Sequence, residues 1–152
     1  MESPEVQAAL GAAVEDVLET MCFACVIGSS DQPPTEPGLG ASPVIAELRF
    51  IGSPSGGFRL GVEAQVARLF AAAFLGREES ELSEVQTGEV VCELANMICG
   101  SVLSRLERDI TFHITHPELA SPEAAADARG TVRWFELEEG LLNTSLLLEQ
   151  VP

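Results

Sequence analysis

The sequence VQTGEVVCELANMICGSVLSRLE, residues 85–107, has the apolar periodicity of one long helix. When residue 91 is set at zero and each residue advances by about 100°, six apolar side chains fall within about 60° of one line. They are Val91, Leu94, Ala95, Ile98, Val102 and Leu106. Such a stripe packs against a core, and Ser83 is a candidate N-cap residue just before it. We therefore predict an amphipathic helix over 85–107 with one buried face.

The opposite face of this helix carries an acid and an amide, Glu93 and Asn96, whose spacing of three makes them neighbours. Glu89, Gly100 and Glu107 lie on the same face. Glycine inside a helix costs about 1 kcal/mol relative to alanine, and asparagine is a weak helix former. Two unfavourable residues on an exposed face indicate selection for something other than helix stability. The residues alone define a candidate recognition surface, with Gly100 as an open shelf, and the alternative is a polar face that is simply solvated.

Upstream of this helix, the pattern predicts a helix, a strand, a loop, a strand pair and a second helix. Pro4 suits the first helical position, residues in 44–51 alternate in polarity as in a half-buried strand, and Gly76 is a plausible helix end. The expected ranges are 5–21 for the first helix, 23–28 for the strand, 29–43 for the loop, 44–51 and 57–62 for the strand pair, and 63–75 for the second helix.

Downstream of residue 107, we expect strands and one short alanine-rich segment that follows Pro117 and Pro122. The strands are expected at 110–115 and in a hairpin with arms at 130–138 and 141–149, which turns at Glu139–Gly140. This order predicts an α+β fold, an antiparallel sheet packed by long helices, in a single domain over residues 1–152. Because 141–150 is apolar, we expect it to be an edge strand that pairs between subunits.

The charge of the chain limits its partners. All eight basic residues are arginine, and 24 acidic residues give a net charge of −16. Nucleic acid and anionic membrane surfaces are poor partners because phosphate binding needs a basic footprint. There is also no apolar run near the length of about 20 residues that crosses a bilayer. The first residues are acidic, unlike a signal peptide, so a cytoplasmic location is expected.

The cysteines and histidines offer the motifs closest to a metal or redox site. Cys22 and Cys25 have the spacing of a zinc or redox half-site. No second such pair exists, so we interpret all four cysteines as small buried hydrophobes, with a zinc or redox domain as the alternative. His113 and His116, on or just after a strand, would point to opposite faces and suit a chelate badly. We therefore expect no metal site.

The segment from Gly88 to Glu107 resembles the signature helix of the CheC/CheX/FliY class of chemotaxis phosphatases. The shared kernel is Glu-x-x-Asn followed by an apolar pair and glycine, here Glu93-Leu-Ala-Asn96-Met-Ile-Cys-Gly100. The order of elements is also similar over most of the chain. The resemblance is closer to CheX, since CheC-type proteins tend to carry a second Glu-x-x-Asn on the first helix, and no Asn occurs in 5–21 here.

This resemblance implies a substrate, which is the aspartyl phosphate of a CheY-like response regulator. It also implies roles for the catalytic pair: Asn96 would orient the attacking water and Glu93 would engage a lysine of the regulator. Glu89 and Gly100 would face the partner. No cofactor of its own is implied, because the Mg²⁺ belongs to the response regulator. A homodimer is expected by analogy. The alternative is a non-catalytic module that binds a response regulator, or a flagellar-switch-like adaptor.

Overall fold

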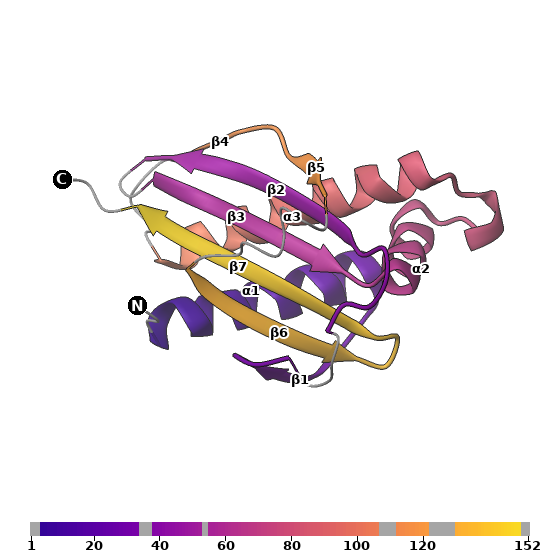
Figure 1. Ribbon diagram of the computed structural model, residues 1–152, viewed down its shortest axis with the longest axis horizontal. Helices are drawn as coiled ribbons and strands as arrows, with labels where there is room; N and C mark the ends of the chain where they lie inside the picture. The colour runs from indigo at the N-terminus through magenta and orange to yellow at the C-terminus, as the bar shows by residue number, and fades with distance from the viewer. Residues whose placement is uncertain (1–3, 34–37, 53–54, 107–111, 122–129, 150–152) are drawn as a thin grey trace.

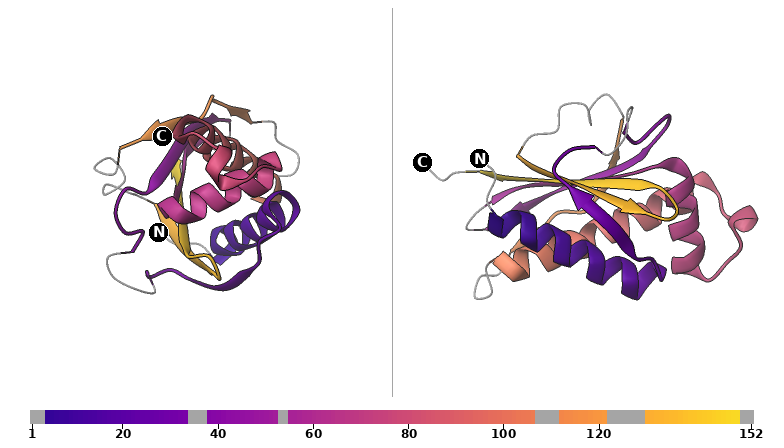
Figure 2. Two further views of the ribbon diagram at one scale, coloured as in Figure 1. Left: turned by 90° about the vertical axis from the view of Figure 1, so that its right-hand side faces the viewer. Right: turned by 90° about the horizontal axis from the view of Figure 1, so that it is seen from below.

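The computed structural model describes residues 4–33, 38–52, 55–106, 112–121 and 130–149, and three long helices cover one face of a seven-stranded antiparallel sheet (Figures 1 and 2). The α+β class predicted from the sequence is confirmed. The strand order is β1-β6-β7-β3-β2-β4, and β5 also pairs with β2. The strands are β1 Val26–Ser30, β2 Val44–Ile51, β3 Ser55–Val62, β4 His113–Ile114, β5 Glu118–Ala120, β6 Thr131–Leu137 and β7 Leu141–Glu149.

The helices are α1 Pro4–Cys22, α2 Ala64–Leu75 and α3 Glu84–Leu106, and a short 3-10 helix η1 covers Glu79–Glu81. Their ends follow the expected chemistry. Pro4 opens α1, and Gly76 closes α2 in the left-handed conformation, with φ of 64°, and donates its N–H to the Ala72 carbonyl oxygen. α3 packs against α1, α2 and the β2–β3 hairpin, which makes it the central helix of the layer.

The core lies between the helical layer and the inner face of the sheet. Phe50, Phe58 and Phe135 are its largest fully buried side chains, contributed by β2, β3 and β6. The predicted stripe of α3 supplies the opposing surface, because Val91, Leu94, Ala95, Ile98 and Val102 are at most 1% exposed, while Leu106 packs at the margin and is half-buried. The phase assigned to this helix from the sequence is therefore confirmed.

The prediction that the last strand forms an edge is wrong. β7 pairs with β6 on one side and with β3 on the other, so it lies in the middle of the sheet. The strand is apolar because Leu142 and Leu146 face the helices and are almost completely buried. Among the described strands, the outer positions belong to β1 at one side and to β4 and β5 at the other. Edge pairing between subunits through β7 is not available in this arrangement.

Two further strand predictions need correction. The first strand begins at Val26 rather than at residue 23, because Phe23 takes a left-handed conformation, with φ of 56°, after the end of α1. The strand expected at 110–115 is reduced, within the described residues, to His113–Ile114. β5 was not predicted. Most of the alanine-rich segment and all of residues 107–111, which include Glu107, lie outside the described residues.

Candidate functional site

The start of α3 is fixed by a reciprocal capping interaction. The Gln86 backbone N–H donates to Ser83 Oγ at 3.1 Å, and the Ser83 N–H donates to the Gln86 side-chain oxygen at 2.9 Å. This arrangement satisfies two backbone donors at the helix start and fixes its first turn. Because the buried stripe then sets the rotation of the helix, the positions of the outward side chains follow from it.

The outward face of α3 presents the acid–amide pair predicted from the sequence. Glu89 and Glu93 are exposed, whereas Asn96 and Gly100 are half-buried. Within the part of the chain that the structure describes, neither the Glu93 carboxylate nor the Asn96 amide has a hydrogen-bond or ion-pair partner. A carboxylate and a carboxamide are thus displayed three residues apart, with their bonding capacity open to a partner.

Two glycines of α3 lie against the edge strands, and they differ in how tightly they are packed. A Cβ atom at Gly100 would meet only Ile114 Cδ1 of β4, at 3.9 Å, which is ordinary contact. Internal packing therefore does not require glycine at position 100, in keeping with an open shelf. A Cβ atom at Gly88, in contrast, would lie 2.7 Å from Leu119 Cδ1 of β5. The sequence did not reveal this second contact, since Gly88 and Leu119 are far apart along the chain.

The cysteines are mostly structural. Burial raises the pKa of the Cys22 and Cys99 thiols to about 12, and burial together with the nearby Glu89 carboxylate raises the pKa of Cys92. These three thiols are therefore protonated at neutral pH, and the thiolate is the form that binds metals and acts as a nucleophile. Cys25 is exposed and Cys92 is only half-buried, so the interpretation of all four cysteines as buried is wrong for these two. No group of three or more potential metal ligands occurs among the described residues.

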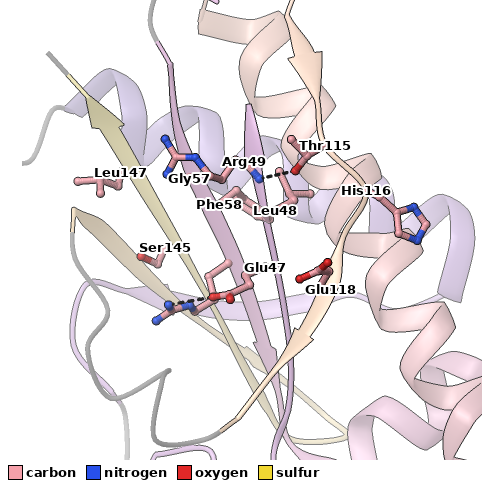
Figure 3. Close-up of a pocket in the computed structure, with 11 residues that line it drawn as sticks. Glu47, Leu48, Arg49, Gly57, Phe58, Thr115, His116, Glu118, Ser145 and Leu147 are labelled. Atoms are coloured by element: carbon pink, nitrogen blue, oxygen red, sulfur yellow. Dashed lines mark hydrogen bonds and ion pairs between the residues drawn. The ribbon is translucent and has the colours of Figure 1, made fainter. Parts of the chain in front are cut away.

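A groove of about 600 Å³ lies on the other face of the sheet, away from the helices (Figure 3). Two ion pairs lie along the groove, and Glu118 and His116 also line it. Arg59 donates to Glu47 at 3.0 Å, and Arg49 forms an ion pair with Glu149. The Thr115 hydroxyl accepts from the Arg49 backbone N–H at 2.9 Å and tethers the segment between β4 and β5 to β2. This groove could not be predicted from the sequence, because its lining combines the β2–β3 hairpin with residues of β7 and of the segment 115–118, which are far away along the chain.

The helices of the described part of the chain include none that is both long and apolar enough to cross a membrane.

The two histidines are exposed, His113 in β4 and His116 just beyond it, and His116 lines the groove.

Solved structures of chemotaxis proteins share this fold. CheX from Desulfovibrio desulfuricans is 23% identical, with a TM-score of 0.71, and the match covers 95% of this chain and 99% of that one. CheX from Borrelia burgdorferi, solved as a complex with CheY, BeF3 and Mg²⁺, is 18% identical, with a TM-score of 0.72 and coverage of 95% and 98%. FliY from Thermotoga maritima is 16% identical, with a TM-score of 0.60 and coverage of 97% and 92%. The chain therefore has the fold that CheX and FliY share.

A family model described as chemotaxis phosphatase CheX matches residues 44–132, which is more than half of the chain and includes all of α3. The protein belongs to the CheX family. A comparison with curated protein sequences found no match. The resemblance inferred from the signature helix is thus confirmed at the level of the family.

Proposed function

We propose that the protein hydrolyses the aspartyl phosphate of a CheY-like response regulator in chemotaxis or a related two-component pathway. The observation that carries this proposal is the display of Glu93 and Asn96 on α3, opposite the buried stripe and without partners among the described residues. Two facts support it: the chain belongs to the CheX family, and CheX from Borrelia burgdorferi forms a complex with CheY.

Asn96 is proposed to hold the attacking water in line with the phosphorus. Phosphoryl transfer asks for positioning and charge stabilisation more than for covalent chemistry by the protein. A carboxamide offers a donor and an acceptor without net charge, so it can bind a water molecule beside an anionic phosphoryl group without repelling that group. Because α3 is fixed by its cap and its buried face, the Asn96 backbone is held rigidly, which favours a defined water position.

Glu93 is proposed to bind a lysine of the regulator. Its side chain is exposed in the free protein, and its attraction to a cation becomes stronger when the interface excludes water. The spacing of three residues lets Glu93 and Asn96 reach one cleft of the partner together. Glu89 and Gly100 extend the same surface, Glu89 as a further acidic contact and Gly100 as the position where the partner approaches closely.

No cofactor of its own enters this proposal, because the Mg²⁺ is bound by the response regulator. The protein is proposed to act in the cytoplasm as a homodimer.

The test is a dephosphorylation assay with phosphorylated receiver domains from the same genome. Wild type should accelerate loss of phosphate from at least one receiver, and Asn96→Ala should abolish most of that acceleration. Glu15→Ala, which removes an exposed carboxylate from α1, is the control and should behave as wild type. Equal dephosphorylation with and without the protein, together with measurable binding, would instead support the adaptor function.

A further inference from the structure

Two large apolar side chains are exposed next to the outward face of α3. Val85, in the first turn of the helix, is 69% exposed, and Leu119, in β5, is 55% exposed. Leu119 lies over the backbone at Gly88, and Val85 is three residues from Gly88, on a neighbouring position of the helix surface. Val85 and Leu119 therefore flank one point of α3, and we call them together the apolar ledge.

The position of Leu119 follows from the pairing of the edge strand. Leu119 is opposite Ala46 of β2, and residues paired across strands share a face of the sheet. Ala46 is fully buried on the helix side, so Leu119 projects to that side as well. β5 lies at the outer position of the sheet, and Leu119 reaches α3 at Gly88. More than half of this side chain is left to solvent.

The apolar ledge is continuous with the proposed catalytic pair. On the helical wheel, Val85 shares an arc of about 80° with Glu93 and Asn96. The distance along the helix from position 85 to position 96 is about 16 Å at 1.5 Å per residue. This length fits within one protein interface, which typically covers about 800 Å² on each partner. Interfaces of this kind combine an apolar centre with charged and polar groups around it.

We propose that the apolar ledge docks the receiver domain of the response regulator and so sets the affinity with which its aspartyl phosphate reaches Asn96. This inference rests on the proposed function, and it names residues that the signature helix does not include. Charge favours a regulator over a second copy of this chain as the occupant. Glu89 and Glu93 border the ledge on α3, and each copy carries a net charge of −16, so two copies would meet here with like charges. A receiver that offers a lysine to Glu93 meets the acidic border with a cation.

The first experiment measures the affinity for receiver domains from the same genome, activated with BeF3 and Mg²⁺. Leu119→Ala should weaken binding about tenfold, as expected for a central apolar contact, and Val85→Ala about threefold. The rate of hydrolysis at saturating phosphorylated receiver should remain that of wild type. Ile27→Ala is the matched control, because Ile27 is 61% exposed and lies on β1, at the opposite side of the sheet. It should bind as wild type does.

The second experiment uses Gly88→Ala, which moves Leu119 without removing it. The added Cβ would lie 2.7 Å from the flexible end of Leu119, so that side chain must shift. Binding should weaken about threefold in Gly88→Ala, and the substitution should have no further effect on binding in the Leu119→Ala background. The midpoint temperature of thermal unfolding should not fall, because alanine is a better helix former than glycine. A loss of affinity in Gly88→Ala therefore reports the position of Leu119 rather than misfolding.

The outcomes separate this inference from the proposed function. Suppose that Asn96→Ala abolishes hydrolysis but Leu119→Ala binds the receiver as tightly as Ile27→Ala does. The docking role of the apolar ledge is then overturned, while the proposed phosphatase function is supported. If wild type binds a receiver without hydrolysing its phosphate, the affinities still decide the role of the ledge. If Leu119→Ala changes only the self-association seen by sedimentation, the occupant is a second copy and the inference is overturned. If no activated receiver binds, both proposals fail.

Discussion

The outward face of α3 and the outer face of the sheet both carry charged side chains, but they use them differently. On the sheet, Glu47 pairs with Arg59 and Glu149 with Arg49, so both arginines that line the groove are paired within the molecule. On α3, Glu93 and Asn96 have no such partners among the described residues. Charged groups that satisfy one another stabilise a surface, whereas unpaired ones leave their bonding capacity for another molecule. This contrast favours α3 over the groove as the surface that meets a partner, in keeping with the proposed function.

The largest effect is expected when the charge of the α3 amide is changed without changing its size. Asn96→Asp should lower the dephosphorylation rate at saturating receiver by at least about 100-fold, which corresponds to about 2.7 kcal/mol. The introduced carboxylate repels the anionic phosphoryl group and cannot donate a hydrogen bond to it or to a water molecule. Single-turnover measurements of phosphate loss give this rate directly. A decrease of the same size in receiver affinity alone would show that Asn96 acts in docking rather than in chemistry.

A smaller effect, and one on a different parameter, is expected for the acid of the pair. Glu93→Gln should weaken receiver binding about tenfold, equivalent to about 1.4 kcal/mol, with a much smaller change in the rate at saturation. It should also reduce the salt dependence of binding, because a charge contact across the interface is lost. Titrations at low and high ionic strength measure both quantities. Glu47→Gln is the matched control from the paired surface and should leave affinity and salt dependence unchanged.

At the glycine shelf, Gly100, we expect stability and receiver binding to change in opposite directions. Gly100→Ala should raise the free energy of unfolding by up to about 1 kcal/mol, since its Cβ meets only ordinary contact with Ile114. The same methyl group would occupy the space through which the partner approaches, so receiver affinity should fall about threefold. Denaturant unfolding and receiver titration on the same sample test the two parts. A variant that is more stable and binds normally would mean that the shelf is not part of the interface.

The contrast between the two faces also explains what the sequence could predict. The rotation of α3 could be read from it because five stripe residues, the cap at Ser83 and the helical period are all local. The resemblance to CheX then assigned roles to Glu93 and Asn96. The central place of β7 could not be predicted, because strand order depends on pairings with β3 that are about 85 residues away in sequence. β5 is three residues long and too short to show alternation, so its contact between Leu119 and Gly88 could not be predicted either.

The smallest effect on stability and activity is expected for a substitution on the sheet, which tests the contrast between the two faces directly. Glu47→Gln removes one partner of the Arg59 ion pair, whose side chains are 23% and 42% exposed for Arg59 and Glu47 respectively. Ion pairs this accessible to solvent contribute at most about 1 kcal/mol, so the midpoint of denaturant unfolding should shift slightly, and less at high salt. Phosphatase activity should be unchanged. If Glu47→Gln lowers activity while the protein stays folded, the groove takes part in function, and paired charge no longer distinguishes a structural surface from a working one.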